Sequence, residues 1–243
     1  MPVGLDGNPD PIVTEARVAV LDRTVRHVIT RAKGRQRVCV AVDGRSGAGK
    51  STFADEMVPG LRRAGFETLR STTDSFHHPR SERMRLGSTS SEGYFLDSHQ
   101  LDVLVEELLD PFRTGREQVL VAAFDEPSDA PHRQTATLGN RPTVLVFDGL
   151  FVHRPELVGF WDASIYLSAD ERLDRRWLDH LLTDLPEEPS RQAAALDDRL
   201  RTARWPRYRD GWFNYATTVD PAAISSISID NNDLSHPRVM RES

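Results

Sequence analysis

The chain has 243 residues, of which 38% are hydrophobic and 28% charged, and its net charge is -6 at pH 7. This length fits one α/β domain with its own core, and the negative charge disfavours a general nucleic-acid binder. The single cysteine, Cys39, excludes an internal disulfide framework and a cysteine-based metal centre. The sequence also lacks an apolar signal core and any apolar stretch long enough to span a bilayer. We therefore expect a cytoplasmic protein with no nucleic-acid and no membrane partner.

The predicted elements alternate along the chain. Residues 1–10 are expected to form a flexible tail, and residues 11–243 one domain. Apolar residues recur at helical spacing between residues 14 and 32, which predicts an amphipathic helix packed on a sheet. Strands are then expected at 37–42, 66–72, 119–123, 143–147, 163–167 and 223–229, and helices at 50–58, 98–109, 170–182 and 191–204. This alternation is typical of an α/β fold with a mostly parallel sheet, whose ligands bind beyond the carboxyl ends of the strands.

The first expected strand runs directly into a phosphate-binding loop. Residues 44–51 match the P-loop pattern Gly-x-x-x-x-Gly-Lys-Ser. Glycines let backbone N–H groups turn toward phosphates, Lys50 reaches the β and γ phosphate oxygens, and Ser51 can bind Mg²⁺ at the start of a helix whose dipole favours anions. The pattern therefore predicts a nucleotide site. Its expected ATP-binding residues are Gly44, Ser46, Gly47, Ala48, Gly49, Lys50, Ser51 and Thr52.

Two aspartates follow expected strands at the same edge of the sheet. Asp74 comes after the second strand, where a kinase needs a base to accept the proton of an attacking hydroxyl. Asp148 ends a hydrophobic strand, a pattern that holds Mg²⁺ through water in P-loop proteins. Each aspartate also has a purely structural interpretation, because Asp at a strand end often caps a turn or a helix. The neighbouring P-loop favours the chemical interpretation for both.

Together these segments resemble the uridine kinase group of P-loop kinases, whose superfamily also includes phosphoribulokinases and pantothenate kinases. The resemblance is carried by Asp-Gly-x-Ser-Gly-x-Gly-Lys-Ser-Thr at 43–52, Asp-Ser-Phe-His at 74–77, Tyr-Phe-x-Asp-Ser at 94–98, Ala-Phe-Asp at 123–125, Phe-Asp-Gly-Leu-Phe at 147–151 and Arg-Leu-x-Arg-Arg at 172–176. It implies a three-layer P-loop fold with a five-stranded, mostly parallel core sheet and helices on both faces. It also implies a small β-hairpin beside the acceptor site and a helical lid at about residues 178–192.

The resemblance also implies roles for individual residues. An aspartate such as Asp74 is the base and a metal contact in this family, an aspartate such as Asp97 grips sugar hydroxyls, and an aromatic residue such as Phe124 packs on the acceptor. The expected catalytic residues are Lys50, Asp74, Arg172, Arg175 and Arg176. The expected acceptor-binding residues are Asp74, Phe76, His77, Tyr94, Asp97 and Phe124. The expected metal ligands are Ser51, Asp74 and Asp148.

The expected function is ATP- and Mg²⁺-dependent phosphoryl transfer to a primary hydroxyl of a small metabolite, with a uridine- or cytidine-like nucleoside as first candidate. Two segments depart from the uridine kinase pattern: the acidic residues at 183–188, where an Arg-rich lid tip is usual, and residues 124–127, in the base-reading segment. Pantothenate or a sugar phosphate therefore stays open as the acceptor. A P-loop protein without kinase activity is the alternative of another class. A homo-oligomer also stays open.

Overall fold

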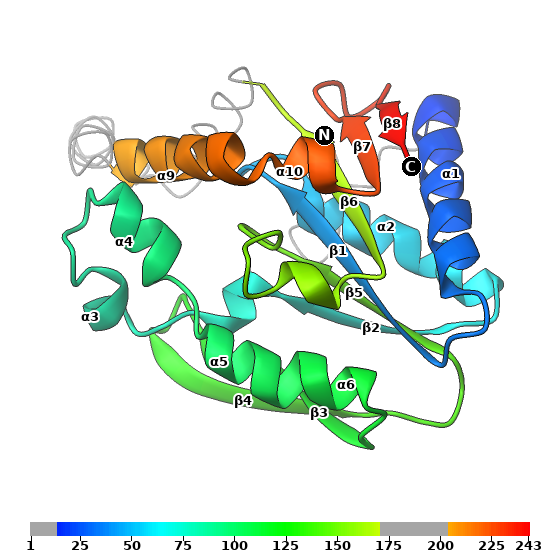
Figure 1. The fold of residues 1–243 in the computed structure, drawn as a ribbon, viewed down its shortest axis with the longest axis horizontal. Coiled ribbons are helices and arrows are strands. Elements are labelled where there is room, and N and C mark those ends of the chain that lie inside the picture. Colours follow the sequence, from blue (N-terminus) through cyan, green and yellow to red (C-terminus); the bar gives the residue numbers. More distant parts are fainter. Residues whose placement is uncertain (1–13, 171–203) are drawn as a thin grey trace, which may run out of the picture.

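The computed structural model describes residues 14–170 and 204–243, and within them a six-stranded sheet has the order β2-β5-β1-β6-β7-β8 (Figure 1). The strands are β1 (Arg37–Gly44), β2 (Glu67–Thr72), β5 (Thr143–Asp148), β6 (Ala163–Ser168), β7 (Ile227–Asp230) and β8 (Arg238–Glu242). The first five in this order pair in parallel, and β8 pairs antiparallel with β7. The predicted five-stranded parallel core is confirmed, with an antiparallel edge strand that the sequence pattern did not predict.

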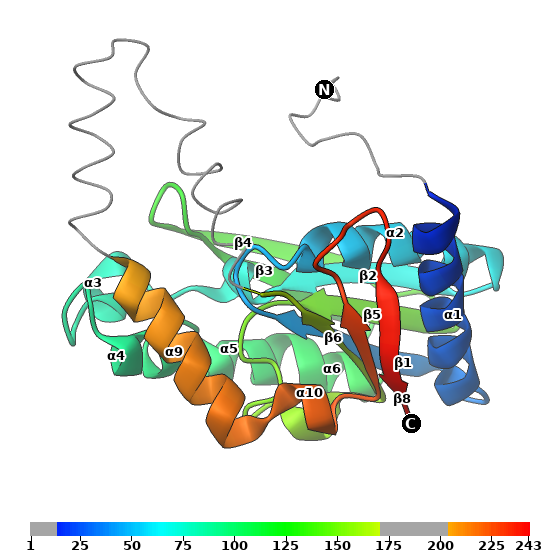
Figure 2. The ribbon, with the colours of Figure 1, turned by 90° about the horizontal axis from the view of Figure 1, so that it is seen from above.

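Helices cover both faces of this sheet, as predicted (Figures 1 and 2). The side chains of β1 alternate between two cores, because successive residues of a strand point to opposite faces. Val38, Val40 and Val42 pack with α1 (Glu15–Ala32) and α2 (Lys50–Arg63). On the opposite face, Cys39 and Ala41 pack with a helical stretch made of α5 (Leu101–Leu104), the π-helical turn η2 (Val105–Leu109) and α6 (Asp110–Arg113).

A separate β-hairpin consists of β3 (Gln118–Asp125) and β4 (Ala130–Thr137), which pair antiparallel. The residue pattern placed the 119–123 strand in the alternating series, and that position is corrected here. The family resemblance, by contrast, implied such a hairpin. β3 is almost wholly apolar because it packs into the second core, whereas β4 is largely exposed.

Several predicted boundaries shift. The helix expected at 50–58 continues to Arg63 through Pro59, and the strand expected at 223–229 begins as the short helix α10 (Pro221–Ile224) before β7. Helix α9 (Arg204–Val219) begins where the last predicted helix was expected to end. Several predictions lie outside the described residues. They are the tail at 1–10, nearly all of the helices expected at 170–182 and 191–204, the lid at 178–192, and Arg172, Arg175 and Arg176. No helix in the described part of the chain is long and apolar enough to cross a membrane.

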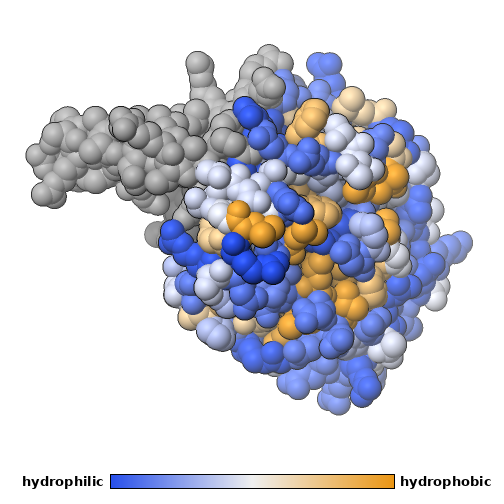
Figure 3. Space-filling view, turned by 60° about the vertical axis from the view of Figure 1, so that its left-hand side comes forward, coloured by the Kyte–Doolittle hydropathy of each residue, from blue (hydrophilic) through white to orange (hydrophobic). Residues whose placement is uncertain are grey.

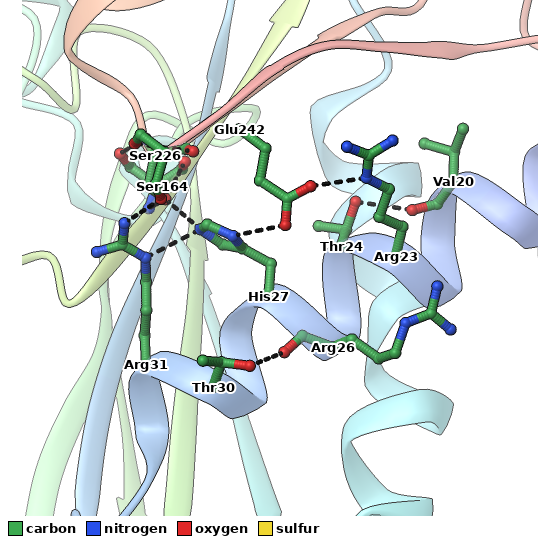
Figure 4. Close-up of polar contacts among 11 residues, drawn as sticks. Val20, Arg23, Thr24, Arg26, His27, Thr30, Arg31, Ser164, Ser226 and Glu242 are labelled. Atoms are coloured by element: carbon green, nitrogen blue, oxygen red, sulfur yellow. Dashed lines mark hydrogen bonds and ion pairs between the residues drawn. The ribbon is translucent and has the colours of Figure 1, made fainter.

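Polar contacts with α1 hold the edge strand β8 in place (Figure 4). One oxygen of Glu242 accepts a hydrogen bond from Arg23 Nε at 2.6 Å, and the other lies 3.1 Å from His27 Nδ1. His27 Nε2 lies 3.0 Å from the Ser226 hydroxyl, which donates to the Ser164 carbonyl oxygen. Burial lowers the pKa of His27 despite its hydrogen bond to Glu242. These contacts explain how so polar a strand joins the sheet.

The register of the parallel strands sets the position of the acidic residues. Asp148 of β5 is level with Val42 of β1 on one side and with Thr72 of β2 on the other. The three strands therefore end at the same height, immediately before the P-loop, before the loop that carries Asp74, and at Asp148 itself. This confirms that segments far apart in the sequence converge at one edge of the sheet.

Candidate active site

The P-loop joins β1 to α2 through backbone conformations that only glycine adopts easily. Gly47 and Gly49 have φ values of 76° and 83°, in the left-handed region. A Cβ atom on Gly44, whose φ is 154°, would lie 2.7 Å from the carbonyl oxygen of Leu167. The loop is also braced from outside, because the Asn231 side-chain amide donates to the Ala48 carbonyl oxygen at 2.7 Å. Sterics thus fix the loop in a shape whose N–H groups can meet an anion.

Lys50 lies at the first position of α2, with its ammonium turned back over the loop. Its Nζ donates to the carbonyl oxygen of Arg45 at 3.0 Å. Burial lowers the pKa of Lys50, and the carboxylates of Asp74, Asp148 and Asp43 oppose that shift. The three carboxylates that surround the ammonium all follow or end a sheet strand. A bound polyphosphate would bring further negative charge to the same ammonium.

Ser51 and Asp148 meet directly. The Ser51 hydroxyl donates to Asp148 Oδ2 at 2.7 Å, and Arg70 Nη2 donates to Asp148 Oδ1 at 2.7 Å. Arg70 also binds Asp55 through Nε at 2.8 Å. A hydroxyl and a buried carboxylate side by side are the oxygen donors that suit Mg²⁺, which keeps much of its water shell. The only sequence signal for Arg70 is its charge within an otherwise strand-like run, which does not by itself indicate a partner for Asp148.

The loop that carries Asp74 packs against the turn that follows β5. Asp74 lies in a short 3-10 turn, η1 (Thr73–Phe76), and is exposed. A Cβ atom on Gly149 would lie 2.1 Å from Thr73 Oγ1, so only glycine permits this contact. Thr73 Oγ1 also accepts from the backbone N–H of Leu150 at 3.2 Å. The Asp-Gly pair after β5 therefore brings the two acidic loops together.

A cleft of about 640 Å³ opens beside these loops. Its walls include Ser46 of the P-loop, Asp74, and side chains from the hairpin and from the helix α4 (Ser91–Leu96). Four predicted acceptor residues line it: Asp74, His77, Tyr94 and Phe124. Figure 3 views the molecule from the side on which α4 and α9 lie in Figure 1, and apolar side chains gather there within a largely hydrophilic surface. The cleft thus extends from the phosphate loop to a wall that includes the aromatic side chains of Tyr94, Phe124 and Tyr208.

A family model described as the phosphoribulokinase / uridine kinase family matches residues 39–187. The chain belongs to this family. It is 30% identical over 117 residues to a pantothenate kinase of Rhodopseudomonas palustris strain TIE-1, a match that covers 44% of this chain and 36% of that protein. It is 22% identical over 171 residues to a uridine kinase of Leuconostoc citreum strain KM20, covering 70% and 80% respectively. The matches to pantothenate kinases cover 36% to 47% of those proteins' length.

The fold is shared with solved structures of the same kind. A possible uridine kinase from Bacillus stearothermophilus superposes with a TM-score of 0.65 at 19% identity, and the match covers 87% of this chain and 96% of that one. At this identity the likeness concerns the fold alone. It agrees with the P-loop fold class predicted from the sequence.

Two residues that the family motifs suggested for acceptor binding do not reach the cleft. Phe76 is fully buried in the second core, where it anchors the loop that carries Asp74. Asp97 ends α4, and its Oδ1 accepts from Arg85 Nη2 at 2.9 Å. Asp97 is not among the residues that line the cleft. The motif fixed where these residues lie in the chain but not the direction of their side chains.

A buried hydrogen-bond network, which the sequence pattern did not predict, connects the start of the P-loop to helix α9. The Asp43 carboxylate accepts from the Gly44 backbone N–H at 2.8 Å, from the Tyr215 hydroxyl at 2.5 Å, and it contacts His153 Nδ1 at 2.7 Å. Burial, and next the nearby Asp43, raise the pKa of Tyr215 far above its usual value, so the hydroxyl keeps its proton as the donor. Asp43 was noted as a strand-end acid, whereas its partners lie too far along the chain for any sequence pattern to reveal.

Replacing Tyr215 by phenylalanine tests this network. We expect Tyr215→Phe to lower the free energy of unfolding by about 1–3 kcal/mol, because the buried Asp43 loses a donor. Chemical denaturation measures the change. The matched control is Tyr166→Phe, which removes a half-buried hydroxyl for which no hydrogen bond is seen within the described residues, and it should change stability little. Equal stability of Tyr215→Phe and the wild type would argue against the network.

Replacing Asp148 by asparagine tests the metal position. Asp148→Asn keeps the size of the side chain but weakens the negative field at Ser51, so the Mg²⁺ concentration for half-maximal activity should rise about ten-fold. Magnesium titration at saturating ATP measures it. Asp55→Asn is the control, because Asp55 binds the same Arg70 from an exposed position. An unchanged magnesium requirement in Asp148→Asn would remove Asp148 from the metal site.

Proposed function

We propose that the protein is an ATP- and Mg²⁺-dependent kinase that phosphorylates a primary hydroxyl of a small metabolite, with a uridine- or cytidine-like nucleoside as the first candidate acceptor. The observation that carries this proposal is that Ser46 of the P-loop and Asp74 line the same cleft. A phosphate donor and a hydroxyl acceptor can therefore meet in one space, next to a carboxylate. Membership of the phosphoribulokinase / uridine kinase family supports the same chemistry.

In the proposed reaction the phosphates of ATP lie along the loop at 44–52 with Lys50 against the β and γ groups. Ser51 and Asp74 would hold Mg²⁺, with Asp148 acting through water, and the ion would neutralise charge on the transferred group. Asp74 accepts the proton of the acceptor hydroxyl while the oxygen of that hydroxyl bonds to the γ phosphorus. The bond from that phosphorus to the bridging oxygen breaks, and ADP leaves. Positioning of the two substrates supplies much of the rate enhancement.

The charges around the cleft favour a neutral acceptor. Arg83 lines the cleft, and its Nη1 donates to Glu126 at 2.6 Å while Nη2 donates to Asp129 at 3.3 Å. Arg207 also lines the cleft, where its guanidinium donates to the carbonyl oxygens of Ser90 and Arg83. Both arginines are thus already engaged by protein acceptors. A nucleoside fits this setting better than a carboxylate or a phosphate ester would.

Pantothenate is the second candidate, because several relatives are named pantothenate kinases. Pantothenate carries a carboxylate, so its binding would require an arginine of the cleft to exchange a protein partner for the ligand. The two candidates therefore predict different effects of Glu126→Gln, which frees Arg83 from one carboxylate. We expect the substitution to favour pantothenate if that is the acceptor and to leave uridine turnover nearly unchanged if it is not.

Other parts of the proposed function depend on residues outside the described ranges. We propose that Arg172, Arg175 and Arg176 contact the phosphates from the base of a lid at about 178–192, as the family resemblance implies. A cytoplasmic location and small-molecule partners belong to the same proposal. Hydrogen exchange across 178–192, measured with and without nucleotide and acceptor, tests the lid directly.

An acceptor panel tests the proposed function. Uridine, cytidine, pantothenate and ribulose 5-phosphate are each offered with ATP and Mg²⁺, and ADP release is compared with a blank that lacks the acceptor. We expect release above the blank with a ribonucleoside. Release that no acceptor stimulates, from a folded protein that binds ATP, would contradict the nucleoside assignment and favour the alternative without kinase activity.

A further inference from the structure

Three side chains with metal-binding atoms form a cluster, and two of them, Asp74 and His77, line the cleft. Asp74, His77 and His99 each offer one ligand atom, and these atoms all lie within 4.8 Å of one another. The two imidazole rings lie side by side with centroids 4.7 Å apart and planes inclined by 34°. The proposed reaction uses Asp74 as the base, and His77 is an expected acceptor contact, but neither role requires a second imidazole beside His77.

The backbone holds the two histidines together. His77 and His99 form an isolated antiparallel bridge. On either side of it, the His78 N–H donates to the Ser98 carbonyl oxygen at 2.9 Å and the Gln100 N–H donates to the Phe76 carbonyl oxygen at 2.7 Å. The loop after β2 and the segment after α4 are thus joined where the imidazoles meet. Such pinning reduces the entropy that a ligand must overcome to order its site.

His99 carries the second observation. Its side chain is 3% exposed, and its Nε2 is buried without a hydrogen-bond partner in the described part of the chain. A buried polar atom left in this state costs free energy, so it calls for an explanation. His27 has partners for both ring nitrogens, whereas His153 Nε2, like His99 Nε2, is buried without one in the described part of the chain. Of these two, His99 is the one that belongs to a cluster of metal-binding side chains. A bound cation would give His99 the partner it lacks.

The ligand types select the cation. Two imidazole nitrogens and one carboxylate suit Zn²⁺ and similar transition-metal ions, whereas Mg²⁺ prefers oxygen ligands. Bonds of about 2.0–2.2 Å in a tetrahedral site place ligand atoms roughly 3.4 Å apart, so the cluster has to contract. The exposed Asp74 carboxylate can supply that movement by rotating its side chain.

The positive charges near the cluster are paired with carboxylates, which reduces their repulsion of a bound cation. Arg83 and Arg154 are the arginines whose charge acts on His99. Arg83 is paired with Glu126 and Asp129, and Arg154 binds both oxygens of Glu156 at 2.9 Å. His78, the remaining neighbour on the loop, lies 3.0 Å from Glu82. Each of these three cationic groups therefore has its own carboxylate. The Lys50 ammonium also acts on Asp74, and the carboxylates of Asp148 and Asp43 offset its charge.

We propose that Asp74, His77 and His99 form a Zn²⁺ site, which shares Asp74 with the expected Mg²⁺ ligands but adds two imidazoles in place of Ser51 and Asp148, and that Zn²⁺ bound there inhibits the enzyme. Zn²⁺ withdraws the Asp74 carboxylate from the acceptor hydroxyl, so the proton has no acceptor while the ion is bound. The inhibition rests on the proposed kinase function. The binding site itself does not.

Calorimetric titration of metal-free protein with Zn²⁺, in the absence of nucleotide, tests the site. We expect one ion per chain at this site, and an affinity lowered at least about ten-fold in His77→Gln and in His99→Gln. His78→Gln is the matched control, because His78 is adjacent in sequence but lies outside the cluster, and it should bind Zn²⁺ as the wild type does. His77 lies on a partly exposed loop, so its variant remains informative should His99→Gln fail to fold.

Undiminished binding in both His77→Gln and His99→Gln, or no binding by the wild type, would overturn the site. A second measurement follows phosphoryl transfer at saturating Mg²⁺ and ATP. Zn²⁺ should lower turnover of the wild type and of His78→Gln, and a chelator should restore it. His99→Gln and His77→Gln should resist Zn²⁺, each compared with its own zinc-free rate because His77 is an expected acceptor contact. Binding without inhibition would overturn the regulatory part alone. If the protein phosphorylated no acceptor, the proposed function and the inhibition would both be wrong, and calorimetry alone would decide whether the Zn²⁺ site exists.

Discussion

Lys50→Arg is expected to lose most phosphoryl transfer, about a hundred-fold in kcat, although it keeps the positive charge. The Lys50 ammonium folds back to the Arg45 carbonyl oxygen at 3.0 Å, inside a loop whose shape glycines fix. A planar guanidinium is longer and wider than an ammonium, so it cannot occupy the same point between the β and γ phosphates. Steady-state kinetics with the best acceptor measures the loss.

The chain offers a matched control for this substitution. Only two lysines occur in the sequence, and Lys33 lies exposed at the end of α1, away from the loop. Lys33→Arg should keep wild-type turnover. ATP affinity of Lys50→Arg should fall less than turnover does, because the backbone N–H groups of the loop remain. If Lys50→Arg turned over near the wild-type rate, the proposed role of the P-loop lysine would be wrong.

Asp74→Asn is expected to lower turnover by roughly two orders of magnitude, the scale of a lost general base. The amide keeps the size of the carboxylate but cannot accept the hydroxyl proton. Because Asp74 is exposed, the substitution should leave the fold and the nucleotide affinity nearly unchanged. Direct detection of the phosphorylated acceptor measures the effect.

Asp125→Asn controls for the loss of a negative charge in the cleft. Asp125 also lines the cleft, but its Oδ2 accepts from the Ser128 backbone N–H at 3.1 Å in the hairpin turn. The Asp125→Asn substitution should change the KM for the acceptor more than kcat. Full turnover of Asp74→Asn, with product measured directly, would rule out Asp74 as the base.

The sequence predicted best where several local signals agreed. The apolar run of β1, the glycines of the loop and the apolar face of α2 all indicated one strand–loop–helix unit, and the structure has it. The strand β8 was not predicted because three of its five residues are charged and none is buried, so its hydrophobicity did not indicate a strand. It forms because Glu242 pairs with Arg23 and His27 across the fold.

Side-chain direction and long-range partners set the limit of prediction at the site. Phe76 and Asp97 occupy the expected positions in the chain, yet one points into the core and the other toward Arg85. Asp43 binds His153 and Tyr215, which are 110 and 172 residues away in sequence. These contacts depend on how α9 packs, and no local pattern encodes that packing.

The transfer of label from ATP tests the central proposal most directly. The protein is incubated with Mg²⁺, ATP labelled at the γ phosphate and a ribonucleoside, and the label is followed into the acceptor ester and into inorganic phosphate. We predict a labelled nucleoside monophosphate, formed only with Mg²⁺ and nearly absent with Lys50→Arg. Label that appears solely as inorganic phosphate, at the same rate with and without any acceptor, would contradict phosphoryl transfer to a hydroxyl in this cleft.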